Sequence, residues 1–187
     1  MKRRIGIFGG SFNPIHVGHI AIAEAVRDSG AVDEVWLMVS PRNPLKEQSS
    51  LMPDTQRLRL AKNAVRNIEG VCASDFEFSL PRPSYTAITM QRLEDAYPYY
   101  QFSLLIGADN WTNFPRWYHY RDLLERYPII IYPRQGFPIN TAALPPSVTY
   151  IHMPLLNISS TQIRQMMANG EDITALVPKE NRESGQK

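Results

Sequence analysis

The stretch RIGIFGGSFNPIHVGH, residues 4–19, decides the fold of this chain of 187 residues. Its first five residues form a short, largely apolar run that predicts a buried strand, and a glycine pair follows directly. Helical periodicity begins near His16, two residues after Pro14, so the stretch predicts a strand-to-helix turn. Such a turn suits an anion, because glycines permit close approach and the helix N-terminus presents unpaired N–H groups.

The same alternation of strand and helix continues along the chain. Short, nearly continuous apolar runs read as strands of a buried parallel sheet at residues 4–8, 35–39, 71–76, 102–106, 129–132 and 148–152. The intervening spacing predicts a helix that ends at Gly30, two that begin with Asp54 and Ser84 as caps, helical pieces over 109–126, and one from Ser159 to Gly170. This order predicts right-handed βαβ units, hence an α/β fold with a single doubly wound parallel sheet.

Composition bounds the class of protein. A chain of this length that is 43% hydrophobic predicts one domain, residues 1–178, followed by a polar tail, 179–187, that is polar enough to be disordered. A formal net charge of +2 argues against nucleic acid as a partner, and the absence of an apolar run of about 18 residues argues against a membrane span. The single cysteine, Cys72, excludes an intramolecular disulfide and is predicted to be a small buried residue, and the expected location is the cytoplasm.

The turn matches neither of the two common phosphate loops. Its glycines are not spaced as GxGxxG, and no Gly-Lys-Ser/Thr sequence ends it. Instead, His16 and His19 are three residues apart, which predicts one face of the first helical turn and hydrogen bonds to phosphate oxygens during phosphoryl or nucleotidyl transfer. Taken alone, each histidine is more typical of capping or packing, and a zinc pair would need a third ligand that does not stand nearby in the sequence.

A second pattern that favours anions stands near the C-terminus. ISSTQIR, residues 158–164, opens a helix with three hydroxyl side chains and places Arg164 about one turn inside it. In isolation this pattern also fits ordinary capping. Together, HVGH at residues 16–19, preceded by GGSFNPI, and ISSTQIR resemble the two motifs of the HxGH nucleotidylyltransferase superfamily.

The resemblance implies a Rossmann-like nucleotidylyltransferase fold and a set of site residues. It implies catalytic roles for His16, His19, Lys46 and Arg164. It implies ATP binding by Gly9, Gly10, Ser11, Phe12, Gly18, Gly107, Ser159, Ser160 and Thr161. Mg²⁺ would be bound by the ATP phosphates, with no side-chain metal ligand.

The middle of the chain resembles the bacterial nicotinate mononucleotide adenylyltransferase family, and the likeness covers residues 1 to about 178. It rests on PRNPLK (41–46), PSYTAIT (83–89), GADNWTNFPRW (107–117) and YPRQG (132–136). By this resemblance, Lys46 and Arg134 contact phosphate, Thr86 lies near the pyridine carboxylate, Asp109 binds ribose hydroxyls and Trp117 stacks on the pyridine ring. The implied reaction is adenylyl transfer from ATP to nicotinate mononucleotide, giving nicotinate adenine dinucleotide and pyrophosphate in NAD biosynthesis.

Two residues depart from that family's pattern. Asn13 stands where members often have Asp, and Ser11 replaces the usual Thr. A carboxylate role at position 13 is therefore unavailable, although an amide side chain can fix the turn by hydrogen bonding.

Several alternatives stay open. Asp109 also fits a helix cap, Trp111 and Phe114 are expected to pack as an apolar cap over the sheet, and Arg82, Arg116 and Arg121 are expected to be solvated surface charges. Nicotinamide mononucleotide and phosphopantetheine stay open as acceptors, and a cytidylyltransferase would share the HxGH motif. A nucleotide-binding module without catalysis is an alternative from a different functional class. A homo-oligomer is compatible with the sequence.

Overall fold

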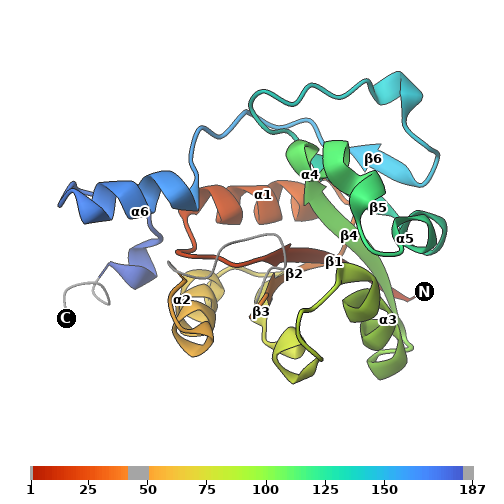
Figure 1. Cartoon of the computed structure of the whole chain (residues 1–187), viewed down its shortest axis with the longest axis horizontal. Coiled ribbons are helices and arrows are strands. Elements are labelled where there is room, and N and C mark those ends of the chain that lie inside the picture. Colours follow the sequence, from red (N-terminus) through yellow and green to blue (C-terminus); the bar gives the residue numbers. More distant parts are fainter. Residues whose placement is uncertain (1, 42–50, 183–187) are drawn as a thin grey trace.

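The computed structural model describes residues 2–41 and 51–182, and its centre is one parallel sheet (Figure 1). The six strands are ordered β3-β2-β1-β4-β5-β6 and every neighbouring pair is parallel. Their bounds are β1 Arg3–Gly10, β2 Glu34–Val39, β3 Val71–Ser74, β4 Tyr100–Gly107, β5 Ile129–Tyr132 and β6 Val148–Tyr150. All six predicted strands and the doubly wound parallel sheet are confirmed.

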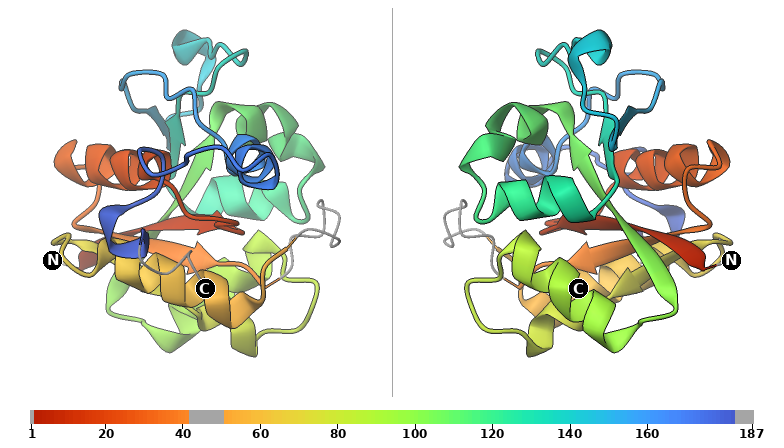
Figure 2. Two further views of the ribbon diagram at one scale, coloured as in Figure 1. Left: turned by 90° about the vertical axis from the view of Figure 1, so that its left-hand side faces the viewer. Right: turned by 90° about the vertical axis from the view of Figure 1, so that its right-hand side faces the viewer.

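Helices cover both faces of this sheet. They are α1 Val17–Asp28, α2 Asp54–Val65, α3 Thr86–Ala96, α4 Ala108–Asn113, α5 Tyr120–Arg126 and α6 Ser160–Ala168, with short 3-10 turns η1 Phe76–Ser79, η2 Phe114–Arg116, η3 Thr141–Ala143 and η4 Lys179–Asn181. The apolar faces of α1 and α2 pack on one side of the sheet, and those of α3 and α5 on the other. Figure 1 shows α2 and α6 toward the left of the molecule, α1 near its centre and α3 and α5 toward the right, and Figure 2 shows the same helices from two further sides.

The strand order places a ligand site at one position in the sheet. From β1 the chain adds β2 and β3 on one side, then crosses to β4 on the other side of β1. The order of the strands therefore reverses between β1 and β4, and parallel sheets bind ligands outside the carboxyl ends of the strands at such a switch point. The turn that follows β1 stands at this position.

The helix ends follow the sequence in part. Gly30 and Gly170 adopt φ values of 74° and 71° just after α1 and α6, as predicted, and the Ser159 hydroxyl caps α6 by accepting the Gln162 N–H at 3.2 Å. The other two predicted caps are wrong. Pro53 and Tyr85 occupy the cap positions of α2 and α3.

The side chains expected to cap these helices have other partners. The Asp54 carboxylate, in the first turn of α2, pairs with Arg57 at 2.6 Å and with Arg82 at 3.1 Å. The Ser84 hydroxyl donates to Glu77 at 3.2 Å. In both places an ionic or carboxylate partner from the tertiary structure replaces the expected bond to the helix backbone.

The prediction for Cys72 is wrong, because its side chain is exposed. It lies on β3, an edge strand that pairs with β2 alone among the described strands. Partial desolvation and the neighbouring Glu34 raise the pKa of the Cys72 thiol to about 11, so the thiol is protonated at neutral pH.

Part of the predicted polar tail belongs to the fold. Residues of η4 pack against α2, and the Asn181 side-chain amide donates to the Leu60 carbonyl oxygen at 3.0 Å. Residues 183–187 of that tail lie outside the described residues. None of the described helices combines the length and apolar character needed to cross a bilayer.

The packing of the central strands generates a stability prediction. Leu37 on β2 is fully buried, whereas Leu155 is 60% exposed. We expect Leu37→Ala to lower the free energy of unfolding by about 2–5 kcal/mol, and the matched control Leu155→Ala to change it by no more than about 0.5 kcal/mol. Urea denaturation of the two variants measures both values, and equal midpoints would contradict the assigned core.

Candidate active site

A cavity of about 410 Å³ lies at the switch point. Its floor comes from β1 and β4, and its walls from the segments that precede α3 and follow α4. Its lining residues are Ile7, Phe8, Gly9, Gly10, Ser40, Glu77, Ser84, Tyr85, Thr86, Thr89, Met90, Leu104, Leu105, Ile106, Asn110, Arg116, Trp117, Tyr118 and Tyr132. Four residues of the predicted site, Gly9, Gly10, Thr86 and Trp117, therefore meet in one cavity.

The turn after β1 folds tightly around a buried phenyl ring. Phe12 adopts φ 46°, a conformation that a bulky residue seldom takes. Its ring packs over Gly10, where an added Cβ would lie 3.1 Å from the nearest ring atom. The ring also meets Phe8 and His19 edge-on, with centroids 5.8 and 5.0 Å away. The second glycine of the pair thus makes room for this ring.

His16 and His19 stack face to face at the start of α1. Their ring centroids are 3.6 Å apart and the planes differ by 25°. The His16 backbone N–H donates to Nδ1 of His19 at 3.2 Å, which places the proton of a neutral His19 ring on Nε2. The predicted shared face of the two histidines is present, and their catalytic roles stay predictions.

His16 is buried and neutral. Burial, with a smaller contribution from the positive charge of Arg134, lowers the pKa of His16 to about 4. Its Nδ1 atom is enclosed and has no hydrogen-bond partner among residues 2–41 and 51–182. A neutral imidazole donates through one nitrogen only, so the buried His16 ring offers a single N–H donor.

Gly18 provides the space that the His16 ring needs. A Cβ at this position would lie 3.0 Å from Nδ1 of His16 and 2.6 Å from Cγ2 of Ile158. The glycine between the two histidines therefore allows the segment before α6 to approach α1 closely. This is a physical reason for Gly in the HVGH sequence.

The two sequence motifs, about 140 residues apart, are in contact. The Ser160 hydroxyl donates to the Pro14 carbonyl oxygen at 3.0 Å, and Nη1 of Arg164 donates to the Asn13 carbonyl oxygen at 2.7 Å. Nη2 of Arg164 contacts the Thr161 hydroxyl at 3.2 Å. The start of α6 thus docks on the turn after β1, and Arg164 binds the main chain of that turn in this structure.

Trp117 follows η2 and forms one wall of the cavity. Its ring packs on the buried ring of Phe114 at 5.4 Å, and Phe114 in turn stacks on Trp111 at 5.3 Å. The expectation that Trp111 and Phe114 pack as an apolar layer is confirmed. Tyr85 and Tyr118, whose rings lie 4.8 Å apart, are exposed members of the same cavity lining.

Asp109 and Arg134 face each other beside this cavity. Nε of Arg134 lies 3.5 Å from Oδ1 of Asp109, and this oxygen is enclosed without a hydrogen-bond partner among the described residues. Gly107 holds the cap position of α4, so the reading of Asp109 as a helix cap is wrong. Gly107 also leaves room for the Asp109 carboxylate and for the stem of Arg134.

Arginines that sequence reasoning assigned to the surface differ from one another. Arg121 is exposed, as expected, whereas Arg82 pairs with Asp54 while remaining half-exposed. Arg116 is exposed but belongs to the cavity lining.

Lys46, the remaining predicted catalytic residue, lies outside the described residues. The described residues contain no group of three or more His, Cys, Asp or Glu side chains that would hold a metal ion.

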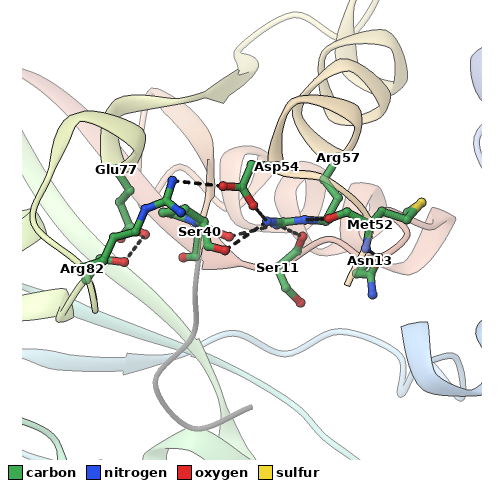
Figure 3. A network of polar contacts seen from close by, with 10 residues as sticks. Ser11, Asn13, Ser40, Met52, Asp54, Arg57, Glu77 and Arg82 are labelled. Carbon is green, nitrogen blue, oxygen red and sulfur yellow. Dashed lines mark hydrogen bonds and ion pairs between the residues drawn. The ribbon is translucent and has the colours of Figure 1, made fainter. Parts of the chain in front are cut away.

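Sequence reasoning missed two buried charged residues, Arg57 and Glu77. Glu77 lines the cavity and accepts hydrogen bonds from the hydroxyls of Thr89 at 2.8 Å and Ser84 at 3.2 Å, which ties η1 to the start of α3. Arg57 is fully buried beside the turn (Figure 3). Its spacing of four and seven residues from the buried Ala61 and Ala64 places it on the inner face of α2, and this was the available signal.

The family model for cytidylyltransferase-like proteins matches residues 7–166 of the chain. The chain belongs to this family. Among its relatives, a probable nicotinate-nucleotide adenylyltransferase of Bacteroides thetaiotaomicron is 48% identical over 92% of this chain and 85% of the relative. A relative of the same description in Flavobacterium johnsoniae is 40% identical over 94% of this chain and 92% of the relative.

A solved structure shares this fold. The nicotinic acid mononucleotide adenylyltransferase of Plasmodium falciparum, complexed with NaAD, superposes with a TM-score of 0.82 at 21% identity, over 98% of this chain and 97% of that one. This likeness shows the fold, and the family model together with the relatives above shows that the chain is a nucleotidyltransferase with a Rossmann-like fold.

The lowered pKa of His16 makes a prediction about stability and pH. The folded protein holds a neutral ring down to about pH 4, while the unfolded chain takes up a proton near pH 6.5. The contribution of the neutral His16 ring to the free energy of unfolding is therefore complete above pH 6.5, and it is lost as the pH falls from 6.5 to 4. We expect the wild type to lose up to about 3 kcal/mol more than His16→Gln over this range.

Denaturant unfolding at a series of pH values measures this difference. His152→Gln is the matched control, because His152 is exposed and should follow the wild type. Parallel pH curves for the wild type and His16→Gln would contradict the buried neutral ring.

The contacts of Gly18 make a second prediction. Replacement of a helical Gly by Ala ordinarily stabilises a helix by up to about 1 kcal/mol. Here we expect Gly18→Ala to lower the melting temperature, because the new methyl group would overlap Ile158. Gly18→Ala should lower the melting temperature less in an Ile158→Ala background than in the wild type, because the smaller side chain removes the overlap. An equal effect of Gly18→Ala in both backgrounds would count against this packing.

Proposed function

We propose that this chain transfers AMP from ATP to nicotinate mononucleotide, forming nicotinate adenine dinucleotide and pyrophosphate in the biosynthesis of NAD. The observation that carries the proposal is the junction of the two motifs. Stacked histidines at the start of α1 and the hydroxyls and arginine of α6 meet at one turn, beside a cavity with an indole wall. The names of the relatives supply the acceptor.

The transfer needs no nucleophile from the protein. An oxygen of the mononucleotide 5′-phosphate attacks the α-phosphorus of ATP, the bond from that phosphorus to the oxygen bridging to the β-phosphorus breaks, and pyrophosphate leaves with both electrons of that bond. The attacking phosphate is ionised at neutral pH, so no base is required. Catalysis therefore rests on alignment and on the stabilisation of negative charge.

His16 and His19 suit this stabilising role. The neutral His16 ring has a single N–H donor, and His19, whose Nδ1 accepts the His16 backbone N–H, has its donor at Nε2; both donors are proposed to bind phosphate oxygens. Gly9 to Phe12, Ser159 to Thr161 and Lys46 are proposed to bind the ATP phosphates with them. Mg²⁺, held by the phosphate oxygens themselves, would offset part of their negative charge.

The ring pocket suits a pyridine mononucleotide. Pyridinium is a cationic aromatic ring, and an indole face attracts such a ring by about 0.5–2 kcal/mol. Trp117 is proposed as this platform, and Thr86, the first residue of α3, is proposed to bind the ring carboxylate at the helix N-terminus. Asp109 is proposed to bind ribose hydroxyls, since its enclosed Oδ1 accepts no hydrogen bond from the described residues, and Arg134 is proposed to face the phosphates.

Three smaller points belong to the same proposal. Residues 1–178 would form the catalytic domain, the enzyme would work in the cytoplasm, and it would use neither nucleic acid nor a membrane as partner.

Substitution of the histidines tests the catalytic assignment. We expect His16→Ala and His19→Ala each to lower kcat by at least about a hundredfold, because each removes a donor to the developing phosphate charge. Circular dichroism and thermal unfolding should show that both variants keep the fold. Near-normal turnover in both would overturn the assignment.

The acceptor is tested by pyrophosphate release from ATP with nicotinate mononucleotide, nicotinamide mononucleotide and phosphopantetheine in parallel. We expect the highest kcat/KM with nicotinate mononucleotide. A preference for either of the other acceptors would replace the proposed substrate, and no release with any of the three would indicate a binding module.

A further inference from the structure

Arg57, in the first turn of α2, is a charged residue with a side chain that is fully buried. A guanidinium has five N–H donors, and each of the five is used here. Nε donates to the Met52 carbonyl oxygen at 3.0 Å, Nη1 to those of Ser11 and Ser40 at 2.5 and 2.9 Å, and Nη2 to that of Pro41 at 3.3 Å and to the Asp54 carboxylate at 2.6 Å (Figure 3).

These acceptors belong to separate segments that meet beside the cavity. Ser11 begins the turn after β1, Ser40 and Pro41 follow β2, and Met52 precedes α2. The Ser40 N–H also donates to the Gly10 carbonyl oxygen at 2.9 Å. One guanidinium therefore cross-links the carboxyl ends of two central strands to the start of a helix, and it fixes where the turn after β1 begins.

The bond to Ser11 also orients the next amide. In a trans peptide the C=O and N–H bonds point in opposite directions, and the peptide between Ser11 and Phe12 is trans. Because the Ser11 oxygen points at Arg57, the Phe12 N–H points away from it. Phe12 holds φ 46°, and such a conformation persists only where surrounding contacts enforce it.

Two further carbonyl oxygens of the same turn are bound by side chains. Arg164 binds the Asn13 oxygen and Ser160 binds the Pro14 oxygen, both from α6. Carbonyl oxygens carry partial negative charge, and a phosphate site is disfavoured by oxygens that point into it. Side-chain donors from α2 and α6 thus engage the oxygens at positions 11, 13 and 14.

We propose that Arg57 is a positioning residue for the adenylyl transfer: by binding the Ser11, Ser40 and Pro41 carbonyl oxygens, it holds the turn of residues 11–14 in the conformation that receives the ATP phosphates. This inference rests on the proposed function of the turn. Arg57 itself touches no reacting atom. Its effect reaches the substrate through the backbone of Ser11 and Phe12.

The chemistry of the site explains why arginine is needed. Lysine also carries a positive charge but has three N–H donors on one nitrogen, so it cannot reach five acceptors spread over a planar fork. Methionine would leave all four carbonyl oxygens without this donor. Arg57→Lys therefore keeps the charge and loses the geometry, while Arg57→Met loses both.

The test measures steady-state kinetics of Arg57→Lys and Arg57→Met well below their melting temperatures. We expect kcat/KM for ATP to fall by about tenfold in Arg57→Lys and by more in Arg57→Met, with KM for the mononucleotide within about twofold of wild type. A purely structural role would lower the melting temperature and leave the kinetics of the folded enzyme unchanged.

Arg82→Met is the matched control. Arg82 binds the other oxygen of the same carboxylate, Asp54, but is half-exposed and contacts no carbonyl oxygen of the turn in the described structure. It should keep wild-type kinetics. A fall in kcat/KM for ATP as large as that in Arg57→Lys would assign the effect to Asp54 and overturn the proposal.

Calorimetric binding of pyrophosphate separates this proposal from the proposed function. If the wild type turns over no acceptor but binds pyrophosphate, a weaker affinity in Arg57→Lys still supports the positioning role. Unchanged kcat/KM for ATP, or unchanged pyrophosphate affinity where there is no turnover, would overturn it. Loss of the folded state in both Arg57 variants would also overturn it, because the residue would then be structural.

Discussion

The turn between β1 and α1 depends on how its carbonyl oxygens are bound. A turn that receives an anion must direct amides toward the ligand, and each peptide unit that does so directs an oxygen the other way. Here side chains from two helices bind these oxygens: Arg57 from α2, and Ser160 and Arg164 from α6. The docking of both helices on the turn follows from this one requirement, as does the contact between motifs that are far apart in the sequence.

The histidines illustrate how burial adjusts chemistry in this fold. A buried imidazole avoids a positive charge, and His16 is therefore neutral at physiological pH. A neutral ring retains one N–H donor, which suffices for a reaction whose nucleophile is already ionised. The stack of His16 on His19 and the space left by Gly18 place that donor at the start of α1.

Local patterns in the sequence predicted the regular structure well. Short apolar runs identified all six strands, because a strand buried on both faces of a parallel sheet is apolar at nearly every position. Caps were predicted well only where no other partner competed. Ser159 caps α6, whereas Asp54 and Ser84 bind side chains from other segments, and a local rule has no access to those partners.

By itself, the sequence determined the order of strands and helices along the chain, the turn that follows the first strand, and the identity of the two motifs that meet there. These features depend on periodicity and on the chemistry of neighbouring residues. Only the tertiary structure decided that Arg57 and Glu77 are buried, that Cys72 is exposed, and that Arg164 binds the main chain of the turn. Each of these depends on groups distant in the sequence, because a charge can be buried only where the fold brings enough partners to it.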